Sequence, residues 1–316
     1  MGFEMLLGND RLKQNLTESL AKNHISHFYL ISGPEGSGKH TLAKLLAAAI
    51  LCQSGKKPCL TCNSCRKLMD GNHPDFITVE DPEHKNVAVK IVREFREDVF
   101  IRPNESDYKI YMLAQDLGTE GQNALLKILE EPPKYGVFLL LTDNPEKLLP
   151  TVRSRCTQLA LQALPEEVLR RELKRQFPQS EDADIAAAVF RSGGFLGQAK
   201  QLLESGGSVE PQTESFAEAF AARDSLRLVQ TLVPMEKWKR DALASVLQSW
   251  LELMEMALAC RSGIQSPSPL ARQLAASRSS QELYAAAGKL KKAVDYCLSN
   301  VSPAAVCGYL AWTLRE

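Results

Sequence analysis

Short apolar runs alternate with longer stretches of helical pattern in the first half of the chain. Helical patterns begin near Lys39, Val89 and Thr119, and a short one lies around Glu146. The five apolar runs that we interpret as strands are Phe28–Ile31, Phe76–Val79, Lys109–Ala114, Val137–Thr142 and Thr157–Leu161. Because strands that alternate with helices are typical of βαβ units, this half of the chain is predicted to form a parallel sheet covered by helices.

Strand patterns disappear after Pro165. Three helical stretches follow up to Glu204, and a small, polar run over 205–211 is typical of a linker. The remaining residues are helical throughout, apart from a break rich in Ser and Pro at 262–269. We therefore predict four parts in chain order: an α/β core over 1–162, a small helical lid over 163–205, a linker over 206–213 and an all-helical C-terminal domain over 214–316.

The charge balance of the chain is even, with 38 Lys and Arg residues against 38 Asp and Glu residues. No overall electrostatic field therefore recruits nucleic acid, and any contact with DNA has to be local. The N-terminal residues include Glu4, Asp10, Arg11 and Lys13 and lack an apolar run of secretory length. Because no stretch approaches the roughly 20 apolar residues of a membrane span, we expect a cytoplasmic protein without membrane contact.

A phosphate-loop sequence connects the first predicted strand to the helix that follows it. In such a loop the backbone N–H groups surround the phosphates, the Lys reaches the β/γ-phosphates, and the next hydroxyl binds Mg²⁺. Here His40 takes the hydroxyl position, and Thr41 follows about 100° further around the helix. The candidate nucleotide-binding residues are Gly33, Gly36, Ser37, Gly38, Lys39, His40 and Thr41. The pattern predicts a loop with room for ATP or ADP, but nucleotide binding is not expected to be required.

The strand over 109–113 ends without the acidic pair that an ATPase of this type uses for the metal and the attacking water. Ala114 and Gln115 occupy these positions, and neither binds Mg²⁺ usefully or acts as a base. Asp116 comes next and offers a carboxylate for the metal, but no Glu follows it. Two separate parts of a hydrolytic site are therefore missing from this chain.

Half of the eight cysteines are compressed into one short segment, and they are Cys52, Cys59, Cys62 and Cys65. Two successive C-x-x-C steps in a reducing compartment favour a tetrahedral, structural zinc site over disulfides. A set of loop thiols is the plainer alternative, and a redox pair would need only one C-x-x-C step. Four basic residues flank the cluster, and they are Lys56, Lys57, Arg66 and Lys67. They leave open a zinc-bearing module that binds nucleic acid.

Three further motifs carry a family resemblance: the run over 123–133, the apolar strand over 138–142, and Ser154-Arg155-Cys156. With the phosphate loop and the cysteines, they resemble the clamp-loader AAA+ proteins of bacterial DNA polymerase III, and within them the delta-prime subunits. The resemblance covers about 6–204 and extends more loosely over the C-terminal helices. It implies a P-loop NTPase-like α/β AAA+ core, a helical lid and an all-α C-terminal collar, with zinc held at 52–65. That zinc module is shared with the ATP-hydrolysing gamma/tau subunits.

Departures from the hydrolysing members distinguish this chain within the family. His40 and the Ala114-Gln115 pair are two of them, and Gly197 is a third, because it replaces a phosphate-sensing Arg of the lid. The stretch between Ala114 and Asn123 is also shorter than in the family. Three losses on one chain imply a subunit without independent catalysis within the DNA polymerase holoenzyme. An ATP-hydrolysing gamma/tau-like motor that tolerates His40 is the alternative.

Arg155 is the residue to which the resemblance gives a catalytic role. In the family, the Ser-Arg-Cys motif projects an arginine finger into the ATP site of the neighbouring subunit, where a guanidinium stabilises the transferring phosphoryl group. Sequence alone also allows a surface ion pair at this position. The implied partners are gamma/tau and delta subunits in a hetero-pentamer, and through them the sliding clamp and primed DNA. Thr142 takes the position of a residue that senses the γ-phosphate.

Overall fold

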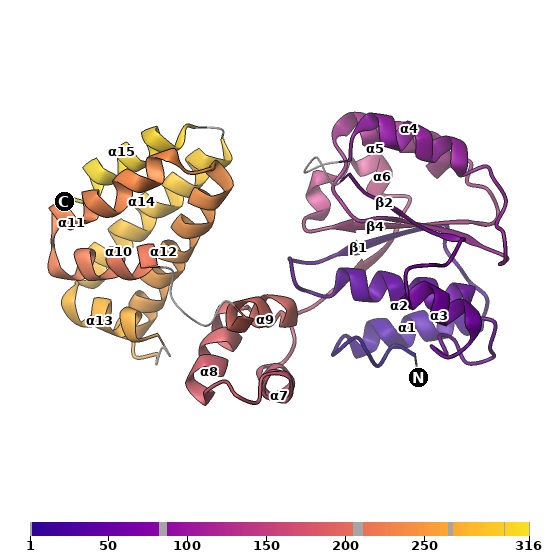
Figure 1. Cartoon of the computed structure of the whole chain (residues 1–316), viewed down its shortest axis with the longest axis horizontal. Helices are drawn as coiled ribbons and strands as arrows, with labels where there is room; N and C mark the ends of the chain where they lie inside the picture. Colours follow the sequence, from indigo (N-terminus) through magenta and orange to yellow (C-terminus); the bar gives the residue numbers. More distant parts are fainter. Residues whose placement is uncertain (1, 82–86, 205–210, 265–267, 300, 316) are drawn as a thin grey trace. The chain divides into compact units, whose positions relative to one another are not determined.

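The computed structural model describes residues 2–81, 87–204, 211–264, 268–299 and 301–315 (Figure 1). The chain divides into two compact units, one made of 1–179 with 189–202 and the other of 180–188 with 203–316. The predicted linker lies largely outside the described residues, and the helix that follows it begins at Pro211. The predicted break at 262–269 lies partly outside them, between helices that end at Arg261 and begin at Pro269.

The first unit is built on a five-stranded parallel sheet with the order β2-β3-β4-β1-β5. Its strands are β1 (Phe28–Ser32), β2 (Phe76–Val79), β3 (Lys109–Leu113), β4 (Gly136–Thr142) and β5 (Thr157–Ala160). The three central strands are buried along their whole length, whereas the edge strands β2 and β5 are partly exposed. Because a parallel sheet is covered on both faces, its central strands are near-continuous apolar runs, and this explains why they were visible in the sequence.

Helices cover both faces of this sheet (Figure 1). One layer contains α1 (Asp10–Ala21), α2 (Lys39–Leu51) and α3 (Asn63–Met69), and the other contains α4 (Val89–Asp98), α5 (Thr119–Glu130) and α6 (Pro150–Arg153). Alternate side chains of β1 enter the two cores, Tyr29 and Ile31 on the α2 side and Phe28 and Leu30 on the α5 side. This alternation is the two-residue period of a strand, and it fixes which residues of β1 face which layer.

Three helices follow the sheet, as the sequence predicted. They are α7 (Glu166–Gln176), α8 (Asp182–Arg191) and α9 (Leu196–Glu204). α7 and most of α9 belong to the first unit, whereas most of α8 belongs to the second. The backbone N–H of Leu164 donates to the carbonyl oxygen of Gly194 at 2.8 Å. This bond joins the segment before α7 to the segment before α9.

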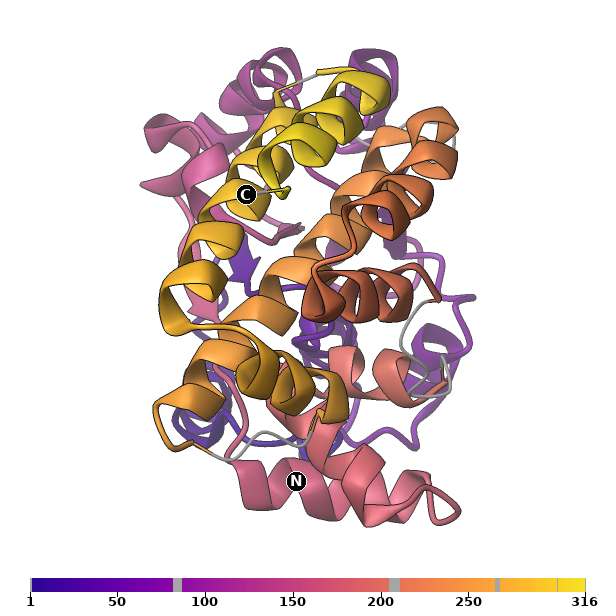
Figure 2. The same cartoon turned by 90° about the vertical axis from the view of Figure 1, so that its left-hand side faces the viewer.

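The described residues of the second unit form helices and no strand, in agreement with the prediction. Its elements are α10 (Pro211–Ala222), α11 (Ser225–Leu232), the 3₁₀ turn η2 (Val233–Lys237), α12 (Arg240–Arg261), α13 (Pro269–Ser277), α14 (Ser280–Leu298) and α15 (Pro303–Thr313). α12 packs along α14 (Figure 2). At the centre, the Trp250 ring stacks on Phe216 with 4.0 Å between centroids, and its indole N–H donates to Thr213. A buried indole with its donor paired stabilises a core.

The expectation that no stretch approaches a membrane span needs a correction. α12 has 22 residues and is long and apolar enough to cross a membrane by length and composition. Its apolar residues Leu243, Leu247, Trp250 and Met254 are fully buried in the core of the second unit, among α13, α14 and α15. The apolar length of α12 is therefore accounted for by packing within a helical core.

The predicted fold class is confirmed: an α/β core with a parallel sheet is followed by a helical C-terminal region. Each strand lies within one residue of its predicted ends, and α2, α4 and α5 begin at the predicted residues. Sequence analysis missed α1 and α3. Asn9 precedes α1 in a left-handed conformation without a side-chain capping bond, and α3 is short and capped by Cys62. α1 does have a start signal in Asn9 and Asp10, whereas α3 follows a cysteine and has only seven residues.

Candidate functional site

The phosphate loop leaves the carboxyl end of β1 and enters α2. Gly36 and Gly38 have φ angles of 73° and 97°, a left-handed conformation that glycine adopts without strain. The loop borders a cavity of about 490 Å³, together with Ala114 and Asp143 from the strand ends and residues around Gly197 from the lid. Every predicted nucleotide-binding residue from Gly36 to Thr41 lines this cavity. The structure thus brings the predicted loop to the edge of the sheet where ligands of α/β folds bind.

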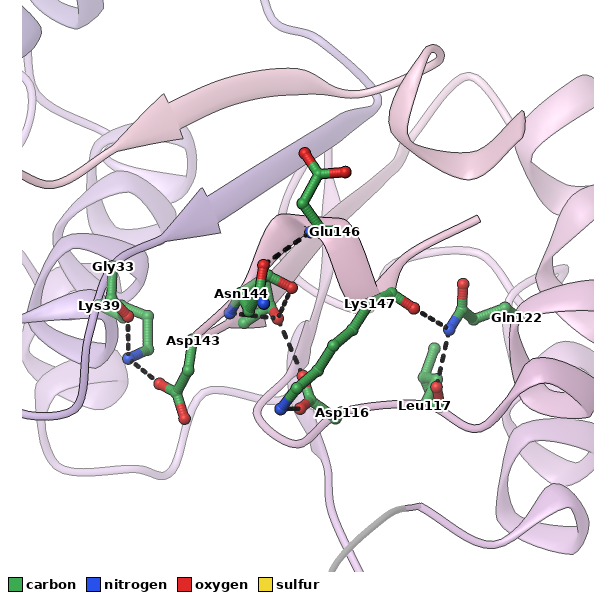
Figure 3. Close-up of polar contacts among 10 residues, drawn as sticks. Gly33, Lys39, Asp116, Leu117, Gln122, Asp143, Asn144, Glu146 and Lys147 are labelled. Atoms are coloured by element: carbon green, nitrogen blue, oxygen red, sulfur yellow. Dashed lines mark hydrogen bonds and ion pairs between the residues drawn. The ribbon is translucent and has the colours of Figure 1, made fainter. Parts of the chain in front are cut away.

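The loop lysine is occupied by groups of the protein itself. Lys39 is only 8% exposed, and its Nζ donates to the carbonyl oxygens of Gly33 at 2.7 Å and Pro34 at 2.9 Å. A third contact is an ion pair with Asp143, with 2.5 Å between Nζ and Oδ1 (Figure 3). An ammonium has three donors, and all three are used here. Sequence analysis did not identify Asp143, which lies directly after β4.

His40 occupies the magnesium position as an exposed side chain at the start of α2. Although the side chain is exposed, partial desolvation of its imidazole, followed by the charges of Lys39 and Lys44, lowers its pKa. A neutral imidazole is a poor ligand for Mg²⁺, which prefers oxygen ligands. Thr41 also borders the cavity, one residue further along the helix. The site therefore lacks the hydroxyl at the position where Mg²⁺ is normally held.

Gln115 and Asp116, which follow β3, both form hydrogen bonds within the protein. Gln115 exchanges two hydrogen bonds with the backbone of Asp81 and so joins the ends of β2 and β3. The Asp116 carboxylate accepts from the Thr142 hydroxyl at 2.9 Å. It also accepts from Lys147 Nζ at 3.1 Å (Figure 3). Thr142, which the sequence placed at a phosphate-sensing position, is buried within this contact. The carboxylate that contacts Lys39 is therefore that of Asp143, not Asp116.

The start of α9 lies directly against the phosphate loop. The N–H of Gly197 donates to the carbonyl oxygen of Gly36 at 2.9 Å. A Cβ atom on Gly197 would lie 2.5 Å from the Cα of Gly36, and a Cβ on Gly36 would lie 2.4 Å from the backbone nitrogen of Gln198. Real Cβ contacts are never this short, so two glycines are required here. The position where the family resemblance placed a lost Arg is thus a point of backbone contact.

The four predicted cysteines come together at the other end of α2. Cys52 caps this helix, Cys59 lies in the following loop, and Cys62 and Cys65 begin α3. Their sulfur atoms all lie within 4.8 Å of one another. Zinc bound by four thiolates needs a cluster of this kind, with Zn–S distances of about 2.3 Å. The residues therefore fit a metal such as zinc.

Backbone N–H groups already point at several of these sulfurs. The N–H of Cys62 donates to Cys59 Sγ at 3.3 Å, and that of Cys65 donates to Cys62 Sγ at 3.5 Å. The N–H groups of Thr61 and Cys62 lower the pKa of Cys59 to about 5, whereas burial raises the pKa of Cys65. A divalent cation binds thiolates, so metal binding would displace the proton that burial keeps on Cys65.

The basic residues near the cysteines differ in their surroundings. Lys56, Lys57 and Arg66 are exposed, whereas Lys67 is half-buried and forms an ion pair of 2.6 Å with Glu105. Three of the four basic residues beside the cysteines are therefore exposed to solvent, and the fourth is paired within the protein.

Arg155 follows the short helix α6 and lies near the surface of the first unit. Its guanidinium donates to the carbonyl oxygen of Thr151 at 2.9 Å and lies 3.6 Å from Glu130, and 41% of the side chain is exposed. Arg153, two residues earlier, is paired with Glu146. An exposed ion pair at 3.6 Å is weak, so the Arg155 guanidinium remains accessible to another molecule.

A buried amide holds the segment that leads to Arg155. Gln122, in α5, is 3% exposed and donates to the carbonyl oxygens of Leu117 at 2.8 Å and Lys147 at 3.2 Å (Figure 3). Its own oxygen accepts from the N–H of Leu149 at 2.7 Å, immediately before α6. One side chain therefore fixes the ends of three segments. Sequence analysis missed it because the contacts reach backbone groups up to 27 positions away.

Comparison with known proteins agrees with this architecture. A gamma subunit-related protein of DNA polymerase III from Thermotoga maritima superposes with a TM-score of 0.51 at 18% identity, over 97% of this chain and 99% of that one. At this identity the likeness shows the fold alone. The gamma/tau subunit of Mycobacterium tuberculosis is 35% identical over 199 residues, which are 61% of this chain and 34% of the relative. The Escherichia coli tau subunit is 35% identical over 176 residues, 54% of this chain and 27% of the relative.

A phosphate loop between a central strand of a parallel sheet and the helix that follows it is the arrangement of a P-loop NTPase-like α/β core. The family model described as "DNA polymerase III, delta subunit" matches residues 8–165, half of the chain. The chain therefore belongs to this family of DNA polymerase III clamp-loader subunits. It spans about a third of the length of the curated gamma/tau relatives that it matches.

Proposed function

We propose that this chain is a delta-prime-like subunit of the DNA polymerase III clamp loader. It does not hydrolyse ATP itself, and it donates Arg155 to the ATP site of a neighbouring gamma/tau subunit. Its partners are gamma/tau and delta subunits in a hetero-pentamer that loads the sliding clamp onto primed DNA in the cytoplasm. The lid over 163–205 and a collar over 214–316 complete the proposed domain organisation.

One contrast carries this proposal. The loop lysine is buried and fully bonded within the protein, whereas the Arg155 guanidinium is 41% exposed and weakly paired. The chain's own site also lacks the hydroxyl and the acidic pair that hydrolysis needs. A subunit with these properties can still act on phosphate in a neighbour's site, because a finger in trans needs only an accessible guanidinium.

The proposed zinc has a structural role. The cysteine module joins the C-terminal end of α2 to α3, and Cys65 is buried against the core of the first unit. A closed set of four thiolates leaves no coordination position for substrate. Zinc here would stabilise the fold and take no part in phosphoryl transfer.

Substitution of Arg155 tests the proposal. In a loader reconstituted with gamma/tau and delta, Arg155→Ala should slow steady-state ATP turnover by about 10³-fold at the site that the finger completes. Arg153→Ala is the matched control, because it removes an arginine two residues away that is already paired. Gel filtration checks that both variants assemble. Turnover that is unchanged by Arg155→Ala in an intact assembly would refute the finger.

The alternative is an ATP-hydrolysing gamma/tau-like motor. It is favoured by one observation, the 35% identity to gamma/tau subunits over 199 residues. Steady-state ATP hydrolysis by the purified chain with Mg²⁺ separates the two functions. We expect no turnover above that of Lys39→Ala; turnover that Lys39→Ala abolishes would establish the motor.

A further inference from the structure

A carboxylate that follows β4 contacts the lysine of the phosphate loop, where a phosphate would otherwise contact it. Asp143 Oδ1 lies 2.5 Å from Lys39 Nζ, and both residues line the same 490 Å³ cavity as the loop. In a nucleotide-binding loop this lysine contacts the β/γ-phosphates. We propose that Asp143 is the specificity-determining residue of this loop, and that its carboxylate keeps nucleoside di- and triphosphates out by holding Lys39.

The charges around the loop support this inference. A nucleotide in the cavity would bring several negative charges next to the carboxylate of Asp143, whose side chain is 59% exposed. In a working ATPase a magnesium ion offsets the acidic side chains of the site. Here His40 and Ala114 stand where Mg²⁺ ligands are needed, so no metal compensates the charge of Asp143. The Asp143 carboxylate and the nucleotide phosphates therefore repel each other, and Lys39 cannot pair with both at once.

The rest of the loop remains suited to an anion. Gly36 and Gly38 keep their left-handed conformations, and the loop leads into the N-terminus of α2. The hydroxyl oxygen of Ser37 is buried and has no hydrogen-bond partner in the part of the chain that the structure describes. An unused donor in a glycine-rich loop at a helix N-terminus is a feature of an anion cradle. Asp143 is thus the group that distinguishes this loop from one open to phosphate.

The position of Asp143 follows from the sheet order. β1 pairs with β4 in register, with Ser32 opposite Thr142, so the residues that follow these strands lie next to each other. Asp143 continues β4 and Gly33 continues β1, and Lys39 reaches both, at the first turn of α2. A neutral residue at 143 would leave the lysine with two carbonyl oxygens and one free donor.

Equilibrium binding of ATP and ADP to the full chain tests the inference, with and without Mg²⁺. Asp143→Asn keeps the size of the side chain and removes its charge. We expect it to bind both nucleotides at least about tenfold more tightly than the natural chain, the size of a modest charge interaction. Asp143 is exposed, so the variant should fold, and a melting curve checks this.

Two further variants isolate the cause. Asp116→Asn removes an equal charge nearby that is held by Thr142 and Lys147, and it should leave nucleotide affinity unchanged. Lys39→Ala combined with Asp143→Asn should abolish the gained affinity. Equal affinity of the natural chain and Asp143→Asn, an equal gain in Asp116→Asn, or a gain that survives loss of Lys39 would each overturn the inference. None of these results bears on Arg155, so this inference goes beyond the proposed function and fails independently of it.

Discussion

The two ends of α2 present opposite electrostatic situations. At its N-terminus a lysine is buried among two carbonyl oxygens and a carboxylate, and the charge is neutralised within the protein. At its C-terminus four sulfur atoms lie within 4.8 Å of one another. The first site contains its own counter-ion, whereas the second would hold four thiolates together only around a metal ion taken from solution. We infer from this difference that α2 depends on a metal at one end and on no nucleotide at the other.

Loss of the metal should produce the largest change. Cys62→Ser removes one of four thiolates and should abolish stoichiometric zinc binding, because the binding free energy at a structural zinc site is folding free energy. With free zinc at about a thousand times its Kd, this is about 4 kcal/mol of stabilisation, or roughly 10 °C in melting temperature. Elemental analysis and thermal unfolding measure both effects.

A chelator should reproduce the effect of Cys62→Ser in the natural chain. Cys260→Ser is the matched control, because Cys260 is half-buried in α12 and far from the cluster in sequence. It should keep the zinc and most of the stability. Full zinc content in Cys62→Ser would contradict the assignment of the four ligands.

A smaller effect is expected where the lid contacts the phosphate loop. Gly197→Ala places a Cβ 2.5 Å from the Cα of Gly36, so the backbone has to shift, at a cost of about 1–3 kcal/mol. Hydrogen exchange at 36–40 should become faster as the start of α9 moves away. Gly288→Ala is the control: this glycine of α14 has open space around it, and the change should stabilise the chain by about 0.5–1 kcal/mol. Unchanged exchange in Gly197→Ala would show that the contact is not needed to hold the loop.

The smallest effect concerns a buried histidine beside the cysteine module. His73 Nε2 lies 2.9 Å from the Ser64 hydroxyl, its Nδ1 accepts from the N–H of Asp75, and Ser64 donates to Leu51 at the end of α2. Burial lowers the pKa of His73. The unfolded chain therefore takes up a proton at higher pH than the folded chain does. The stability from neutral His73 is complete above the unfolded pKa of about 6.5 and decreases as pH falls toward the folded value.

Substitution isolates this contribution. His73→Gln keeps a donor and an acceptor but does not titrate. Between about pH 7.5 and 5.5 the natural chain should lose more unfolding free energy than His73→Gln, by less than about 1.4 kcal/mol per pH unit. Chemical denaturation at several pH values measures this difference. Parallel curves would show that His73 does not contribute, and any acid loss of zinc would affect both chains alike.

The features that sequence analysis predicted are local in the chain. The loop glycines, Lys39 and His40 are adjacent, and the cysteines lie within fourteen consecutive residues, so their chemistry could be inferred from spacing. Central strands were predictable because burial on both faces makes them continuously apolar. Asp143 was not predictable in this way, since its contact with Lys39 spans 104 positions. The pairing of β1 with β4 had to be known first.

Other contacts depend on the backbone and leave little trace in sequence. In the sequence, Gly197 stood out because it replaces an arginine of the family. In the folded chain it lets the backbone of α9 approach Gly36 closely, which the sequence does not indicate. Gln122 reads as an ordinary polar residue in a helix, and its burial follows from three backbone partners. α12 shows the converse, because its apolar composition is compatible with two environments and only the packing distinguishes them.

The bonds of Gln122 have a mechanical consequence for the segment that carries Arg155. The segment from Leu149 to Arg155 is held at its first residue, where the N–H of Leu149 donates to the amide oxygen of Gln122 in α5. Gln122 also donates to the carbonyl oxygen of Lys147; the Lys147 ammonium contacts Asp116, which accepts from Thr142 at the end of β4. The segment that carries Arg155 is therefore anchored at its start to α5 and, through this series of contacts, to the end of β4.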